Sequence, residues 1–194
     1  MKGIVVGPAT VVWSPSVDDR QLAFARSRAL VTDLVGKRFP DAAGWSIGSA
    51  ACPRCGERHG PVELSGVPAV AGVSYAKGLV VAALAPSDSV GQLGVDVELD
   101  AADATRISDV ERLIGSAPEP LLRRWTRIEA VLKADGRGLL VDPGDVRFDG
   151  DTAMIAGDRS VYRVADVDGP GGYVISLAWC DAGSSAASAG QAIR

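Results

Sequence analysis

The segment between residues 121 and 139 constrains the fold more than any other part of the chain. Its large apolar residues recur at the helical positions i, i+4, i+7 and i+11, and they are Leu121, Trp125, Ile128 and Leu132. This spacing places them on one stripe of an α-helix, which must pack against a core. The opposite, solvent-facing side is predicted at Arg123, Arg127 and Ala130.

A carboxylate lies at the edge of that apolar stripe. Glu129 falls between Leu122 and Trp125 on the helical projection. A carboxylate that is half inside a core needs a cation, because desolvation would otherwise raise its pKa and neutralise it. The partner is therefore a basic side chain or a metal ion. Lys133 follows one turn later on the same flank, so a simple surface pair of Glu129 and Lys133 is the alternative.

A second acidic element lies upstream, in the sequence Gly94-Val95-Asp96-Val97-Glu98-Leu99-Asp100. Strict alternation predicts a β-strand whose acidic residues share one face. A solvated edge strand tolerates that arrangement. A divalent cation also explains it, because Asp96 and Glu98 lie about 7 Å apart along a strand and can reach one ion together with Glu129. Hard oxygen ligands favour magnesium or manganese over zinc, and magnesium usually binds substrate phosphates.

These two segments together resemble the surfactin-type 4'-phosphopantetheinyl transferases. The resemblance is carried by the strand Gly94-Val95-Asp96-Val97-Glu98 and by the pattern Trp125-x-x-x-Glu129-x-x-x-Lys133-x-x-Gly136-x-Gly138-Leu139. It implies an α+β fold of two similar α/β halves, related by pseudo-twofold symmetry, with the active site in the cleft between them. Residues 1–88 would form the N-terminal half, and residues 89–181 the C-terminal half with the metal site. The small, polar tail 182–194 is predicted to be disordered.

The same resemblance implies an activity and its residues. The family transfers the phosphopantetheine arm of coenzyme A to a serine of an apo acyl or peptidyl carrier protein. Asp96, Glu98 and Glu129 would hold magnesium, with manganese as a possible substitute. Glu129 would accept the serine proton, and Lys133 would neutralise phosphate charge and protonate the departing 3',5'-ADP. The sequence does not distinguish a fatty acid, polyketide or nonribosomal peptide carrier.

Three further segments bear on coenzyme A. Arg28, in Ser27-Arg28-Ala29-Leu30-Val31, matches the family arginine that approaches a phosphate. Where the family has Ser-His-Ser, with a histidine that contacts the nucleotide phosphate, this chain has Ser74-Tyr75-Ala76. Tyrosine donates one hydrogen bond but carries no positive charge near neutral pH. We therefore expect a weaker or altered grip on coenzyme A, unless Ser74 and Tyr75 merely pack in a hairpin.

A basic residue of the family is also missing. Members with a cysteine-containing loop continue into Gly-Lys-Pro or Gly-Arg-Pro, whereas Gly60 is followed directly by Pro61. We expect Arg58 or His59 to supply the contact instead. These departures motivate a competing hypothesis, a coenzyme A-binding or carrier-binding module that has lost turnover. A magnesium-dependent phosphodiester hydrolase is a third, weaker hypothesis.

The cysteine loop allows two interpretations. Cys52 and Cys55 have Cys-x-x-Cys spacing and precede His59, the single histidine of the chain. Zinc is the less favoured interpretation, because no second ligand pair follows and Cys180 is distant in sequence. Three cysteines in a chain without an evident secretion signal favour reduced thiols, and we expect a cytoplasmic protein.

Composition limits the remaining classes. The 194 residues are 47% apolar and 23% charged, an ordinary globular composition. A net charge of -4 gives a general nucleic-acid role no electrostatic support. No apolar run is long enough to span a bilayer, so no membrane partner is expected. The two-halved architecture implied by the resemblance favours a monomer.

Local patterns predict the other elements. Capping-box patterns place a helix start at Ser16 and another at Ser116, with Asp19 and Glu119 three positions later. The first helix is expected to end near Gly36 and to bury Val17, Phe24, Val31 and Val35. Strands are expected around residues 4–6, 11–13, 70–84 in two runs, 146–148, 153–155, 161–164 and 173–179, with a turn at 142–145.

Overall fold

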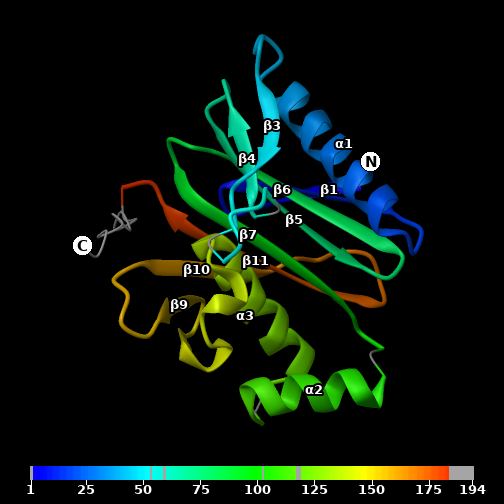
Figure 1. Ribbon diagram of the computed structural model, residues 1–194, viewed down its shortest axis with the longest axis vertical. Helices are drawn as coiled ribbons and strands as arrows, with labels where there is room; N and C mark the ends of the chain where they lie inside the picture. The colour runs from blue at the N-terminus through cyan, green and yellow to red at the C-terminus, as the bar shows by residue number, and fades with distance from the viewer. Residues whose placement is uncertain (1, 53, 59, 102, 117–118, 184–194) are drawn as a thin grey trace.

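The computed structural model describes residues 2–52, 54–58, 60–101, 103–116 and 119–183. It shows a mixed α+β chain in which two antiparallel sheets face each other and a helix covers each outer side (Figure 1). Within these residues there are three α-helices and three sheets. The α+β class predicted from the sequence is therefore confirmed.

The first sheet is built from the N-terminal part of the chain. Its strands, in spatial order, are β1 (Lys2–Val6), β2 (Ala9–Pro15), β6 (Leu79–Pro86) and β5 (Ala69–Ala76). Helix α1 (Arg20–Arg38) packs on its outer face, where Leu30, Val31 and Leu34 meet Val12 and Val80. A small second layer, the pair β3 (Ser46–Ser49) and β4 (Val62–Ser65), lies beside it and was not predicted.

Helix α1 differs from the prediction at its start and in its buried face. Asp19 is the N-cap, because its side chain accepts a 2.9 Å hydrogen bond from the backbone N–H of Leu22. Ser16 therefore lies outside the helix, and Val17 is 60% exposed. Phe24 is also exposed, whereas Val31 and Val35 are buried as expected. The buried face of the helix therefore begins only at Ser27, and it consists of Ser27, Leu30, Val31, Leu34 and Val35.

The second sheet uses the rest of the chain. Its strands, in spatial order, are β7 (Val90–Leu99), β11 (Tyr173–Asp181), β10 (Val161–Asp166), β9 (Thr152–Ile155) and β8 (Val146–Asp149). Helix α3 (Leu121–Asp135) covers its outer face (Figure 1). The predicted stripe is confirmed, because Trp125, Ile128 and Leu132 are buried in the cluster between α3 and this sheet. The predicted strands 146–148, 153–155, 161–164 and 173–179 are confirmed as β8 to β11.

The inner faces of the two sheets form the third core cluster. Val95 and Val97 of β7 lie there with Val11 and Val81 of the first sheet. Because side chains alternate along a strand, Asp96 and Glu98 face the opposite way, toward α3. The predicted alternation is thus confirmed, and the acidic face is covered by a helix.

Helix α3 lies against β7 at backbone contact distance, over Gly94. A Cβ atom at Gly94 would collide with the carbonyl oxygen of Ala130 and the backbone nitrogen of Ala134, and would lie 3.1 Å from the Ala134 Cα. The prediction that Ala130 faces solvent is therefore wrong: it is fully buried at this crossing. Arg123 is exposed as predicted, whereas Arg127 is only partly exposed and pairs with Glu119.

The start of α3 also differs from the prediction. The helix begins at Leu121 behind Pro120, with no side-chain cap, so the capping box at Ser116 and Glu119 was wrong. A further helix, α2 (Ala104–Ile114), precedes it and was not predicted. Asp103 caps α2 by accepting a 2.8 Å hydrogen bond from the backbone N–H of Arg106, and Val110 and Ile114 bury its inner face. Two 3₁₀ turns, Gly138–Leu140 and Pro143–Asp145, follow α3, the second at the predicted turn.

Two further predictions concern the boundary between the halves and the C-terminal tail. The chain passes from the first sheet to the second at residues 87–89, next to the expected boundary between the halves. Most of the tail expected to be disordered, residues 184–194, lies outside the described residues. None of the helices described here has the length and apolarity needed to cross a membrane.

We expect Gly94→Ala to lower the free energy of unfolding by roughly 3 kcal/mol, because the added methyl group forces α3 away from β7. Gly36→Ala is the matched control: a Cβ there meets no atom within 4 Å, and alanine favours the helix by about 0.5 kcal/mol. Urea unfolding of both variants measures the difference. Equal stability of the two variants would show that α3 does not need the contact over Gly94.

Candidate functional site

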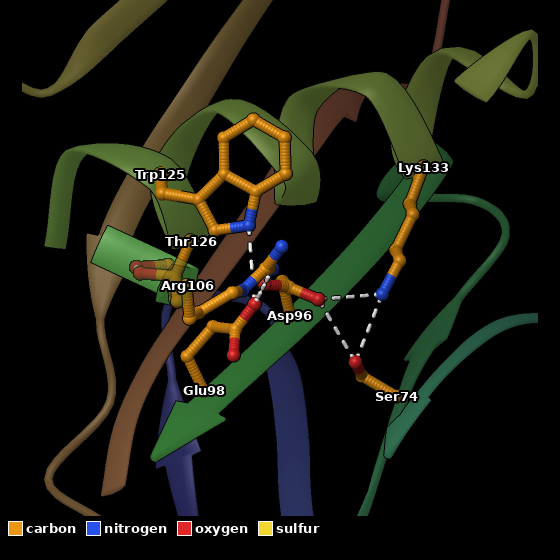
Figure 2. A network of polar contacts seen from close by, with 8 residues as sticks. Ser74, Asp96, Glu98, Arg106, Trp125, Thr126 and Lys133 are labelled. Atoms are coloured by element: carbon orange, nitrogen blue, oxygen red, sulfur yellow. Dashed lines mark hydrogen bonds and ion pairs between the residues drawn. The ribbon is translucent and has the colours of Figure 1, made fainter. Parts of the chain in front are cut away.

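A buried carboxylate lies at the centre of the polar contacts between the two sheets and α3. Asp96 is 5% exposed, and its Oδ1 accepts a 2.6 Å hydrogen bond from Lys133 Nζ and a 2.9 Å bond from Ser74 Oγ. Lys133 also donates to Ser74 Oγ at 2.8 Å, which closes a three-membered network (Figure 2). Ser74 comes from β5, Asp96 from β7 and Lys133 from α3, so the network joins both sheets and the helix.

The second carboxylate of β7 has a separate set of partners. Glu98 Oε1 accepts a 3.2 Å hydrogen bond from Trp125 Nε1 and pairs with the guanidinium of Arg106, which comes from α2. That guanidinium also lies 5.4 Å from the centre of the Trp125 ring, a cation–π distance. Figure 2 shows Arg106 reaching between Trp125 and Glu98. Trp125 therefore packs in the core beneath α3 and also holds the Glu98 carboxylate in position.

The third carboxylate, Glu129, is partly buried on α3 beside the other two. Burial raises the pKa of Glu129, and the negative charge of Asp96 raises it further. Lys133 and Arg106 oppose this increase, and Glu98 adds a smaller one. Glu129 therefore lies close enough to both acids of β7 to sense their charge.

A hydrogen bond under α3 fixes how the helix is rotated. Thr126 and Ser176 are both fully buried, and their hydroxyl oxygens lie 2.9 Å apart. Thr126 also donates to the carbonyl oxygen of Arg123. Because a buried hydroxyl without a partner is costly, this contact favours one rotation of α3 on β11. With this rotation, Lys133 reaches Asp96 on β7.

Asp96, Glu98 and Glu129 carry the hard oxygen ligands that a divalent cation such as magnesium prefers. Asp96, Glu98 and Glu129 come from facing surfaces of β7 and α3, and Asp96 Oδ2 is a buried carboxylate oxygen for which the described residues offer no hydrogen-bond donor. In the side-chain positions of the described residues, no three His, Cys, Asp or Glu groups converge on one point. Asp96 and Glu98 are instead paired with Lys133 and Arg106. The predicted metal role of the three acids stays a prediction.

A cavity of about 760 Å³ opens next to this network. It lies between the start of α1, strand β5, the cysteine loop and the C-terminal end of α3, and Lys133 lines it. The basic residues on its wall are Arg20, Arg28, Arg58, Lys77, Lys133 and Arg137. Asp18 and Asp19 are the only acidic residues among those that line it in the described chain. The cavity thus has an excess of positive charge, although the chain as a whole is acidic.

The predicted coenzyme A residues reach this cavity in part. Arg28 and Tyr75 line it, whereas Ser74 is buried behind it and bonds to Asp96. The Arg28 guanidinium donates 2.7 Å and 2.5 Å hydrogen bonds to Gly48 O and Ser49 Oγ, and its burial lowers the pKa of Arg28. The Tyr75 hydroxyl lies 2.8 Å from Ser27 Oγ on α1. His59 lies outside the described residues.

Two basic residues of this region were not identified from the sequence. Arg106 follows Asp103 by three positions, and the apolar spacing of Ile107, Val110 and Ile114 could have revealed its helix. Arg137, at the cavity wall, pairs with Asp135 and Asp158, and these contacts raise the pKa of Arg137. Arg137 lies between two glycines of the motif in the sequence, and this position did not indicate that it pairs with Asp135 and Asp158.

The cysteines separate into two environments. Cys180 is buried in the core between α3 and the second sheet, whereas Cys52 and Cys55 lie in the loop between β3 and β4. Among the described residues, Cys180 does not form a metal-holding group with Cys52 and Cys55. Cys52 lines the basic cavity.

Comparison with models of known families and with curated proteins finds no match for this chain.

We expect strong coupling between Asp96 and Lys133. Lys133→Met should cost about 2 kcal/mol of unfolding free energy, because it leaves a buried carboxylate without its cation. The double variant Asp96→Asn/Lys133→Met should be more stable than the sum of the single effects by about 1 kcal/mol. The exposed pair Arg123–Asp166, 2.7 Å apart, is the control and should couple by less than about 0.5 kcal/mol. Urea unfolding of the single and double variants of each pair measures the two coupling energies. Equal coupling in the two pairs would contradict a buried charge network.

We also expect a pH-dependent effect at Glu129 in metal-free buffer. A carboxyl group whose folded-state pKa is raised destabilises the protein as pH rises from the unfolded-state pKa through the folded-state pKa. Glu129→Gln should therefore raise the unfolding free energy at neutral pH, and the gain should vanish in acid below the ordinary glutamate pKa. Glu111→Gln, at an exposed position of α2, should show no such pH dependence. A gain at Glu129 that grows in acid would contradict the sign.

Proposed function

We propose that this protein transfers the 4'-phosphopantetheine arm of coenzyme A to a serine of an apo acyl or peptidyl carrier protein. The observation that carries the proposal is the position of Lys133. This residue bonds Asp96 of the acidic strand and also lines the basic cavity. A phosphate-rich substrate held in that cavity would therefore contact Lys133, and through Lys133 it would lie next to Asp96, although none of the three acids is itself among the residues that line the cavity.

The proposed architecture is two α/β halves with pseudo-twofold symmetry and an active site in the cleft between them. Two observations support it. Each sheet carries one long helix on its outer face, α1 on the first and α3 on the second. The hydrogen bond between Ser74 and Asp96 joins a strand of one sheet to a strand of the other at the site.

Magnesium, or manganese in its place, would be held by Asp96, Glu98 and Glu129. When bound, it would supply positive charge that offsets the charge of the pyrophosphate during transfer. The buried, unpaired Asp96 Oδ2 is the observation in favour of such a ligand.

The side chains of the protein account for binding and for the proton. Basic residues of the cavity would hold the pyrophosphate and the nucleotide phosphate by charge-assisted hydrogen bonds. Glu129, with its raised pKa, is a stronger base than an ordinary glutamate when ionised, and would take the proton of the attacking serine. Lys133 holds a proton at Nζ next to the cavity and would give it to the departing 3',5'-ADP.

A second candidate is a module that binds coenzyme A or a carrier protein without turnover. The observation in its favour concerns Arg28, whose two terminal nitrogens already bond Gly48 and Ser49. Tyr75, at the family's histidine position, is likewise bonded to Ser27. Both predicted phosphate contacts therefore have protein partners, so the grip on the substrate would be weaker than the motif implies.

We expect the purified protein, with coenzyme A and magnesium, to add the mass of one phosphopantetheine to an apo carrier protein. Glu129→Ala should reduce this transfer by at least about 100-fold, since general-base catalysis contributes about that much. Glu111→Gln is the control and should retain activity. Intact-mass spectrometry of the carrier measures the transfer.

Two other outcomes would replace the proposal. Measurable binding of coenzyme A with no mass added to acyl or peptidyl carriers would establish the binding module. Release of 3',5'-ADP without any carrier would indicate a magnesium-dependent hydrolase.

A further inference from the structure

The cysteine loop has a closed backbone geometry. The backbone N–H of Cys52 donates a 2.8 Å hydrogen bond to Glu57 O, and the N–H of Gly56 donates a 2.8 Å bond back to Cys52 O. Gly56 has φ +77°, a left-handed conformation that glycine adopts without strain. These contacts fold the loop into a tight turn, and the turn brings the side chains of Cys52 and Cys55 into hydrogen-bonding contact.

The turn also favours the thiolate form of Cys52. The backbone N–H groups of Arg54 and Cys55 donate to the Cys52 sulfur, and these bonds lower the pKa of the Cys52 thiol. The side chain of Cys55 and the charge of Arg54 act in the same direction, whereas burial acts against them. Since the thiolate is the reactive form of cysteine, these contacts favour Cys52 as a nucleophile.

Both thiols can be reached by a small reagent. Cys52 is partly exposed and lines the basic cavity, and Cys55 is exposed. Cys180, in contrast, is fully buried in the core under α3. The chain thus holds one accessible pair and one protected cysteine, which is a convenient internal reference.

From this turn geometry we propose that Cys52 and Cys55 form a redox-active dithiol at the wall of the cavity, in which Cys52 is the nucleophile and Cys55 resolves it. This role is separate from the transferase activity, and neither depends on the other.

The oxidant is hydrogen peroxide, and the reaction proceeds in two steps. The Cys52 thiolate attacks one peroxide oxygen, the O–O bond breaks, and Cys52 becomes a sulfenic acid while hydroxide leaves and takes up a proton. The Cys55 sulfur, having lost its proton, then attacks the Cys52 sulfur and displaces a second hydroxide, which is protonated to water. In total, two thiols lose two electrons and two protons, peroxide is reduced to two waters, and one S–S bond forms.

The test follows thiol oxidation in the full chain. Protein treated with hydrogen peroxide should lose the mass of two hydrogen atoms, and peptide mapping should locate the bond between Cys52 and Cys55. Cys55→Ser should stop at the sulfenic acid, which dimedone traps on Cys52. Cys52→Ser should slow oxidation at this loop by at least about 10-fold, because it removes the stabilised thiolate of Cys52. Cys180 should stay unmodified until the protein is unfolded.

Two results would overturn the proposal. One is oxidation that proceeds at the same rate in Cys52→Ser as in the unsubstituted protein, which would remove the nucleophile's role. The other is one equivalent of zinc that purifies with the protein, masks both thiols and is not released by peroxide, which would make the loop a metal site. Because the readout is the mass of this chain alone, a failed carrier assay does not affect it.

Discussion

The backbone contact of α3 with β7 over Gly94 is the constraint on which the rest of the structure depends. Without a side chain at this position, the helix lies on the strand itself, and two residues of the helix meet it there. At this close packing, Trp125 and Lys133 reach Glu98 and Asp96 by hydrogen bonds, and Glu129 lies near enough to sense both charges. Interiors are close-packed, so even one methyl group at the contact would change every one of these distances.

Because α3 packs closely on β7, the carboxylates of β7 have little contact with water. Each carboxylate of β7 is therefore paired with hydrogen-bond donors of the protein. Asp96 has Lys133 and Ser74, and Glu98 has Arg106 and Trp125. A buried charge without such partners would cost several kcal/mol. Among the three acids Asp96, Glu98 and Glu129, compensation is incomplete at one oxygen of Asp96, which has no hydrogen-bond donor among the described residues, and at Glu129, whose pKa is raised.

Periodicity predicted the parts of this arrangement that depend on one element alone. The stripe of Trp125, Ile128 and Leu132 and the alternation along β7 are properties of a single helix and a single strand, so the sequence revealed both. Ala130 was misplaced because alanine suits either face of a helix, and only the crossing at Gly94 decides which face it takes.

Contacts between elements could not be predicted in the same way. Arg106 joins the site from α2, a helix that was not recognised, and Arg28 turns to the small sheet β3–β4, which was not recognised either. The start of α1 was misjudged because Ser16 and Asp19 can both cap a helix, and the choice depends on how the chain leaves β2. The cavity is formed by segments far apart in the sequence, so no local pattern could outline it.

The hydrogen bond between Ser74 and Asp96 has a mechanical consequence. It spans two sheets that are held together by the apolar layer around Val95, Val11 and Val81. Any sliding of one sheet over the other would pull the serine from the carboxylate and release the lysine from its present orientation. Repacking of that apolar layer, on the opposite face of β7, would thus be transmitted to the polar centre as a change in alignment, with no residue of the centre itself replaced.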